Sequence, residues 1–297
     1  MYLAGILEVA TPLVLAALGC LLTVRAGVDN IGLEGMMLGG AFGAAAVSTT
    51  FLGPWGGLAA AVLVGAALAT LLAWSHLGLG AHFVLAGIAV NLVAAGGTVT
   101  LLYALNRGSG GGSNALESRP LPTVGLSFLD GLPVLGAFAD LSPLTWLAIV
   151  LVPLFVKFYF DTRPGIWIRA VGGNASAVVE AGVSPLRVKW GAMLASGVLA
   201  GVAGAQLSLA TTHTFVRDMT QGRGFIALAA VYLGLKHPVG TVVAATLFGA
   251  FQALTTVLQV RTEFPTDPIS ALPYVATVLA LAVAGLRSLR RPAVAGA

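Results

Sequence analysis

The sequence predicts an all-α, polytopic membrane protein, a bundle of about nine apolar segments. Of its 297 residues, 58% are hydrophobic and 9% are charged, whereas charged residues make up about a quarter of a soluble protein. The apolar residues form runs of about 20, the length of a membrane-spanning helix. The 39 glycines are spread through these runs, where small residues allow close helix packing. A β-barrel is not expected, because period-two alternation is absent.

The apolar runs divide one domain, residues 1–297, into successive segments. Their approximate bounds are 6–24, 31–52, 55–74, 83–105, 143–160, 188–210, 224–235, 239–260 and 272–286. Residues 106–141 form a Gly-, Ser- and Pro-rich loop, and residues 161–189 form a polar loop. Segment 224–235 is short for a full span. If it re-entered the membrane instead of crossing it, every later segment would be inverted.

The basic residues orient this bundle, because Lys and Arg concentrate in cytoplasmic loops. Ten of the 15 fall on one side when the segments alternate: Arg25, Lys157, Arg163, Arg169, Arg187, Lys189, Lys236, Arg287, Arg290 and Arg291. The other five are Arg107, Arg119, Arg217, Arg223 and Arg261. We therefore expect the N-terminus and loop 106–141 outside, and the C-terminus and loop 161–189 in the cytoplasm.

Two further patterns concern helix packing. Residues 35–65 and 224–249 each hold an apolar run, a Gly/Pro break and a Gly-rich apolar run. The topology above gives them opposite directions, as in the inverted repeats of transporters, although chance similarity of Gly/Ala-rich helices explains the echo equally well. Gly197, Gly201 and Gly204 have the spacing of small residues at a helix–helix contact.

The polar loop 161–189 predicts a short helix at about residues 175–181. Asn174 can cap its start, and Gly182 lies where a left-handed helix end is favoured. Ser184 and Pro185 fit the cap and first position of the next helix. A helix of about two turns is marginal alone in water, so it needs a surface to rest on. An ordered connecting loop is the alternative interpretation.

A second polar stretch, residues 25–38, precedes the second apolar segment. Asp29 and Asn30 can cap the helix that starts near Ile31, and Glu34 falls in its first turn, where the helix dipole favours negative charge. Arg25 could pair with Glu34. The alternative is a polar hinge that lines a pathway, because charges beside a membrane helix are costly unless they are paired or meet water.

A third stretch, residues 214–230, leads into the short segment. Gly222 and Gly224 would let the backbone bend there, either as a packed helix start or in contact with a substrate. Asn91, Gln206 and Gln252 are uncharged polar residues within spans. Each is either an interhelical hydrogen bond or a pathway contact, and both interpretations stay open.

The sequence lacks the motifs of several kinds of chemistry. Residues 108–113 are glycine-rich but lack the lysine of a phosphate-binding loop, so the chain is not expected to hydrolyse ATP. Neither a serine nucleophile elbow nor a pair of catalytic carboxylates is found, and the four histidines have no metal-ligand spacing. The net charge of +4 does not indicate nucleic-acid binding, because the basic residues follow the loops.

Three motifs resemble one family. Residues 169–175, Arg-Ala-Val-Gly-Gly-Asn-Ala, with residues 181–185, Ala-Gly-Val-Ser-Pro, look like the cytoplasmic loop of ABC-importer permeases of the nucleoside and simple-sugar branch. Residues 25–38 and 221–230 resemble two further motifs of that branch. The resemblance implies a coupling helix that docks into an ATPase, with the residues Arg169, Gly172, Asn174, Ala175, Glu180 and Gly182. It implies a pathway or hinge at Asp29, Asn30, Glu34, Asn91, Gln206, Gly222, Gly224 and Gln252.

The resemblance further implies a non-enzymatic permease subunit in the bacterial inner membrane. Its partners would be an ATPase subunit that binds ATP and Mg, a second permease subunit and an extracytoplasmic substrate-binding lipoprotein. The cargo would be nucleosides or simple sugars, with branched-chain amino acids as the alternative. An ion-coupled transporter or channel is the rival class, but it needs a carboxylate deep in a span, and Asp29 and Glu34 lie near an end. A membrane scaffold without transport is a third possibility.

Overall fold

The structure is a computed structural model that describes residues 2–106, 115–123 and 141–261. Its first part contains α1 (Tyr2–Arg25), α2 (Leu33–Ser48), α3 (Gly53–Ala73) with the π-helical turn η1 (Trp74–Gly78), and α4 (Phe83–Asn106). Its second part contains α5 (Pro143–Asp161), α6 (Arg163–Gly173), α7 (Ala175–Glu180), α8 (Pro185–Ala205) with the π-helical turn η4 (Gln206–Thr211), α9 (Arg223–Leu233) and α10 (Pro238–Arg261). Strands β1 (Ala115–Glu117) and β2 (Thr214–Val216) pair antiparallel.

Six helices of the described residues are long and apolar enough to cross a membrane: α1, α3, α4, α5, α8 and α10. The protein is therefore a multi-pass helical membrane protein, as the sequence predicts. Helices α2 and α9 are apolar but shorter. The segment expected at 272–286 and most of loop 106–141 lie outside the described residues.

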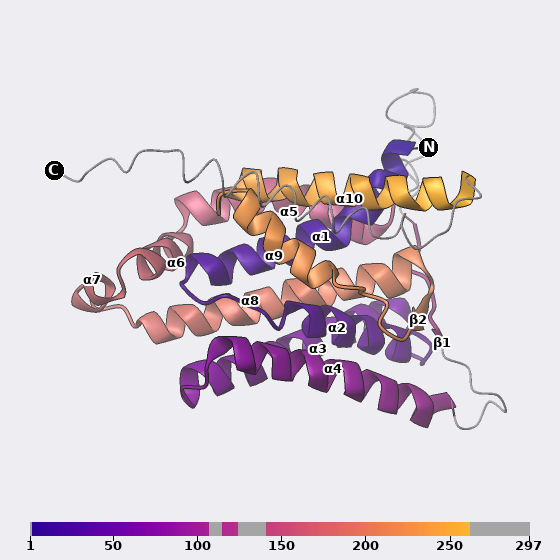
Figure 1. The fold of residues 1–297 in the computed structure, drawn as a ribbon, viewed down its shortest axis with the longest axis horizontal. Coiled ribbons are helices and arrows are strands. Elements are labelled where there is room, and N and C mark those ends of the chain that lie inside the picture. The colour runs from indigo at the N-terminus through magenta and orange to yellow at the C-terminus, as the bar shows by residue number, and fades with distance from the viewer. Residues whose placement is uncertain (1, 107–114, 124–140, 262–297) are drawn as a thin grey trace.

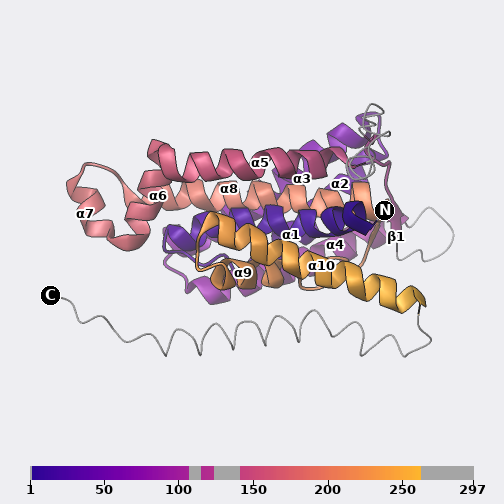
Figure 2. The same cartoon turned by 90° about the horizontal axis from the view of Figure 1, so that it is seen from above.

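Helices α1 and α8 form the centre of the bundle. Buried residues make up 72% of the apolar window of α1 and 78% of that of α8, against 28–33% in the other four long helices. Figure 1 shows α1 and α8 side by side, with α10 and α4 on opposite outer sides, and the contacts between α1 and α10 and between α2 and α4 agree. Figure 2 shows α5 along a third side of the same pair.

The expected glycine contact surface lies on α8. A Cβ at Gly197 would collide with the Ala69 side chain, and a Cβ at Gly201 would collide with the Ala61 carbonyl, both on α3. A Cβ at Gly204 would collide with the Met37 carbonyl on α2. These three positions are therefore close backbone contacts between α8 and its two neighbours, and the packing prediction is confirmed.

The two short helices run in opposite directions. The backbone N–H of Arg119, beside β1, donates to Ser48 Oγ at the end of α2 (3.1 Å), so α2 ends near the strand pair. After α9, the ring of His237 lies 5.5 Å from that of Phe160 at the end of α5, which is the α6 end of the bundle (Figure 1). Segment 217–222 and α9 therefore carry the chain from the β2 end to the α6 end.

We predict that Gly197→Val destabilises the protein while Gly191→Val on the same helix does not. A Cβ at Gly197 meets α3, whereas a Cβ at Gly191 has nothing within 4 Å. Overpacking of this kind costs about 1–3 kcal/mol. Thermal unfolding in detergent, followed by size-exclusion chromatography, measures the difference. Equal melting temperatures for the two variants would show that the α3–α8 contact is not tight.

Candidate functional site

The N-terminus of α9 is bound by a carboxylate from another helix. Glu34, in the first turn of α2, accepts hydrogen bonds from the backbone N–H groups of Gly222 (2.8 Å) and Gly224 (2.6 Å). Gly222 is the N-cap of α9 and has a φ of 77°, a conformation that glycine adopts without strain. A Cβ at Gly224 would lie 2.6 Å from the Glu34 Cα. The two short helices therefore begin against each other inside the bundle, and only glycine fits this approach.

The N-terminus of α2 is bound in the same way by α4. Asn91 Oδ1 accepts from the Gly35 N–H (2.8 Å), and Asn91 Nδ2 donates to the Ile31 carbonyl (3.0 Å). Asn91 thus makes interhelical bonds to the backbone at the start of α2, where the first N–H groups otherwise lack partners.

The expected cap of α2 by Asp29 or Asn30 is wrong. The N-cap residue is Gly32 and no side chain caps it locally, because the neighbouring α4 supplies the acceptor through Asn91. Asn30 is instead fully buried and donates to Ser196 Oγ on α8 (2.9 Å). Asp29 accepts from the Tyr232 hydroxyl on α9 (2.7 Å).

The expected pairing of Arg25 with Glu34 is also wrong. Arg25 Nε donates to the hydroxyl of Tyr159 on α5, while Glu34 is occupied by the start of α9. The guanidinium carbons of Arg25 and Arg169 lie 5.7 and 5.2 Å from the centre of the Tyr159 ring, within the range of cation–π attraction. Tyr159 is fully buried, so α1, α5 and α6 are joined around one aromatic ring.

The polar loop contains one more helix than the sequence indicated. Helix α6 precedes α7, and Thr162 caps it by accepting from the Gly165 N–H. A Cβ at Gly172 would collide with the Arg25 carbonyl, so α6 lies directly on the end of α1. A threonine followed by proline at 164 was the signal for this helix, because proline is favoured in the first turn.

Helix α7 has the ends that the sequence predicts. Asn174 Oδ1 accepts from the N–H groups of Ser176 and Ala177. At the other end, Gly182 has a φ of 78°, its N–H donates to the Val179 carbonyl, and the Val183 N–H donates to the Val178 carbonyl, the Schellman pattern. Of the side chains on this helix, Val178 is buried but Val179 is 59% exposed. The helix therefore presents Val179 and the exposed Glu180 outward, at the end of the bundle (Figure 1).

Gln206 and Gln252 make hydrogen bonds between elements. Gln206 is fully buried and bonds to Ser142 (3.1 Å) and Thr145 (3.3 Å) at the start of α5. Gln252 Oε1 on α10 accepts from Arg223 Nε (3.2 Å). Both thus link helices in this conformation, as Asn91 does.

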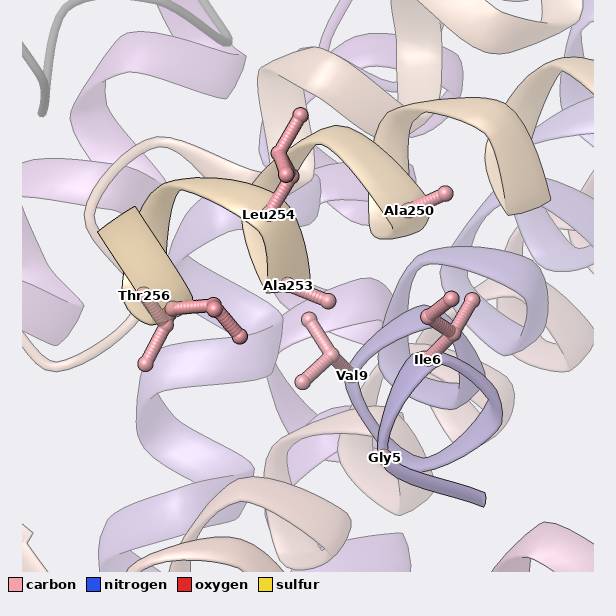
Figure 3. A pocket seen from close by; sticks show the side chains of 8 residues that line it. Gly5, Ile6, Val9, Ala250, Ala253, Leu254 and Thr256 are labelled. Atoms are coloured by element: carbon pink, nitrogen blue, oxygen red, sulfur yellow. The ribbon is translucent and has the colours of Figure 1, made fainter. Parts of the chain in front are cut away.

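Two of the depressions that the described residues form are unlike each other. One, of about 370 Å³, lies between α1 and α10 and has walls of Ile6, Val9, Ala250 and Leu254 (Figure 3). Its Thr256 hydroxyl donates to the Gln252 carbonyl. The other, of about 480 Å³, lies between α2, α4 and segment 217–222, and Arg217 and Asp218 line it. The second therefore offers charged groups to a polar solute. The stretch 214–230 stood out in the sequence, but no pattern placed it beside α4.

This geometry defines a membrane transport subunit: helices that begin inside the bundle, as in many transporters, and a short capped helix presented at one end. Within the described residues, no group of His, Cys, Asp and Glu is arranged to hold a metal ion. The chain belongs to the family described as branched-chain amino acid transport system / permease component, whose model matches residues 2–286. It is a permease subunit of an ABC importer, a transport component and not an enzyme.

Three relatives illustrate the family. The nucleoside ABC transporter permease protein NupC of Lactococcus lactis is 33% identical, covering 94% of this chain and 90% of NupC. The guanosine ABC transporter permease protein NupQ of Bacillus subtilis is 33% identical, covering 92% of this chain and 88% of NupQ. A Haloferax volcanii protein named for a glucose ABC transporter permease is 36% identical over 85% of this chain and 77% of its own length. No solved structure matches the chain.

We predict that Glu34→Ala lowers the melting temperature of the protein in detergent more than Glu34→Gln does. Alanine leaves the buried N–H of Gly224 without an acceptor, a loss of about 1–3 kcal/mol, whereas glutamine keeps one side-chain oxygen. Glu180→Ala is the matched control, because Glu180 is exposed. If Glu34→Ala has the same melting temperature as Glu180→Ala and the wild type, Glu34 is not the cap of α9.

Proposed function

We propose that this subunit imports nucleosides across the bacterial inner membrane by alternating access, driven by a separate ATPase. The ATPase binds ATP and Mg, a second permease subunit completes the pathway, and an extracytoplasmic lipoprotein delivers the cargo. This chain supplies part of the pathway and one docking helix.

We choose the class of cargo from one observation. The two helices that begin inside the bundle, α2 and α9, already have side chains hydrogen-bonded to their N-termini. In many transporters, free N-termini of broken helices bind an anionic group of the substrate. Here Glu34 occupies the start of α9 and Asn91 occupies the start of α2. Neither terminus is left to hold the carboxylate of an amino acid, so the arrangement favours an uncharged cargo such as a nucleoside.

A simple sugar is the second candidate, because sugars are also uncharged. The names of the three relatives also include both kinds of cargo. Two of the names mention nucleosides or guanosine, and the name of the Haloferax protein mentions glucose. The two nucleoside relatives cover more of this chain, and we therefore place nucleosides first.

Helix α7 supports the docking proposal. It is short, capped at both ends, and presents Val179 and Glu180 outward. Behind it, α6 lies on the end of α1 through Gly172, and Arg169 contacts Tyr159. A displacement of α7 by an ATPase would therefore reach α1 and α5 through direct contacts.

The basic residues support a cytoplasmic location for α7. Arg163, Arg169, Arg187 and Lys189 lie on or beside the α6–α7 loop, and Lys236 lies in the turn at the same end. Loops rich in Lys and Arg stay in the cytoplasm. The N-terminus and the end of α10 are then on the outer side, and the cytoplasmic C-terminus expected from the sequence lies outside the described residues.

We also propose that α2–α3 and α9–α10 form an inverted repeat. Each unit is a short helix followed by a long helix that has a proline in its first turn (Pro54 and Pro238). The two short helices begin together and point to opposite ends of the bundle, the arrangement expected when two repeats rock against each other.

Transport in proteoliposomes tests the proposed function. The complex of this chain with its ATPase, second permease and binding protein should accumulate tritiated guanosine only when ATP is supplied on the side of α7. Tritiated glucose and leucine are the comparison cargoes. ATP-driven uptake of glucose or leucine, with none of guanosine, would refute the nucleoside assignment, and ATP-independent uptake would refute the ABC mechanism.

We predict that Ser176→Cys is labelled by a membrane-impermeant thiol reagent only from the cytoplasmic side. Ser176 is exposed on α7, and the native Cys20 is fully buried, so the introduced thiol dominates the signal. Intact spheroplasts and inverted vesicles give the two directions of access. Labelling in intact spheroplasts alone would place α7 outside and contradict the docking proposal.

We predict that Glu180→Arg and Val179→Asp each abolish most guanosine uptake while the chain still inserts into the membrane. Truncating one partner of a buried charged pair costs about 2–5 kcal/mol, and reversing Glu180 in an ATPase groove should cost at least as much. Ser176→Ala on the same helix is the control. Uptake and ATPase pull-down are measured together; normal values of both in Glu180→Arg would show that this face of α7 points to water in the complex.

A further inference from the structure

The cleft beside α4 has the size and groups of a small-molecule site. Its volume of about 480 Å³ falls within the range of about 300–1,000 Å³ that is usual for ligand pockets. Leu38, Ala95 and Val99 form apolar walls, and Thr100, Arg217 and Asp218 supply polar groups.

The charged groups of this cleft are free to bind a solute. Arg217 and Asp218 are exposed, and neither side chain has a hydrogen-bond or ion-pair partner within the part of the chain that the structure describes. Asp218 has a φ of 56°, a conformation that aspartate tolerates better than most residues. Thr100 donates its hydroxyl to the Gly96 carbonyl, so its oxygen can still accept.

The wall of the cleft contains a glycine that leaves room for a solute. A Cβ at Gly96 would have nothing within 4 Å, and neither would a Cβ at Gly97. Gly96 lines the cleft but Gly97 does not. A substitution at Gly97 is therefore a matched control for the same substitution at Gly96 when the cleft is to be filled.

The cleft is also joined to the junction of the two short helices. Leu38 lies one turn after Glu34 on α2, and residues one turn apart share a helix face. Segment 217–222 ends at Gly222, whose N–H donates to Glu34. A movement of α2 against α9 would therefore change the distance between two walls of the cleft.

We propose that this cleft binds the nucleoside during transport. Asp218 accepts hydrogen bonds from the ribose hydroxyls, Arg217 donates to a carbonyl or ring nitrogen of the base, and the apolar walls contact the ring face. One cation and one anion leave the cleft without net charge, which suits an uncharged solute better than a nucleotide. This inference rests on the proposed function and assigns specificity-determining residues to it.

Uptake by the assembled transporter in proteoliposomes tests the cleft, with tritiated guanosine as the probe. Gly96→Leu should fill the cleft and abolish most uptake, whereas Gly97→Leu should transport like the wild type. Asp218→Asn should lower uptake roughly 10-fold or more, the usual effect of losing hydrogen bonds to a charged group. Size-exclusion chromatography of each complex shows that assembly is unchanged.

A selectivity measurement separates contact with the ribose from a structural effect. We expect the ratio of guanosine to 2′,3′-dideoxyguanosine uptake to fall in Asp218→Asn and to stay at the wild-type value in Gly97→Leu. Equal uptake by Gly96→Leu and Gly97→Leu, or an unchanged ratio in Asp218→Asn, overturns the cleft assignment while the wild type still imports guanosine. A wild-type complex that imports no guanosine overturns the proposed cargo itself.

Discussion

The bonds from Glu34 to the start of α9 are the constraint on which the rest of this structure depends. A helix that begins inside an apolar bundle exposes N–H groups that no lipid can satisfy, and each unsatisfied group costs several kcal/mol. The carboxylate of Glu34 satisfies two of them, and Gly224 allows the backbones to approach. The same problem at the start of α2 is solved by Asn91 from α4. Both short helices can therefore exist only as parts of one connected junction.

The junction explains how the two ends of the protein relate. Helix α2 leads from it toward the strand pair, and α9 leads from it toward the α6 end. At that end, α6 joins α1 and α5 through Gly172 and through the two guanidinium groups around Tyr159. Contacts are therefore continuous from α7 through α6 to α1 and α5. Such continuity is needed if the movement of one subunit is to move another.

Local rules of sequence predict much of this fold. Apolar runs locate the long helices to within a few residues, and Asn174 and Gly182 mark the ends of α7. The spacing of Gly197 and Gly201 predicts a close helix–helix contact, and the structure shows that the partner is α3. Each of these depends on residues close together in the chain, or on a helix face that the periodicity defines.

The rest depends on contacts between distant residues. Glu34 was expected to pair with Arg25, but its partners lie 188 and 190 positions away. Asp29 and Asn30 had the right chemistry to cap α2, yet Asn91 does so from another helix. The cleft residues Arg217 and Asp218 form no motif, and only the fold brings them to the side of α4. A single sequence does not state which of several suitable partners the packing will select.

Photocrosslinking from Val179 tests the central claim, that α7 docks onto an ATPase, most directly. A photoreactive amino acid at position 179 would be irradiated in membranes that contain the whole transporter, and the adduct identified by mass spectrometry. Val178, buried on the same helix, provides the control position. The account predicts an adduct with the ATPase subunit from position 179 and little from position 178. An adduct from position 179 with the extracytoplasmic binding protein, or none with the ATPase in an active complex, would contradict it.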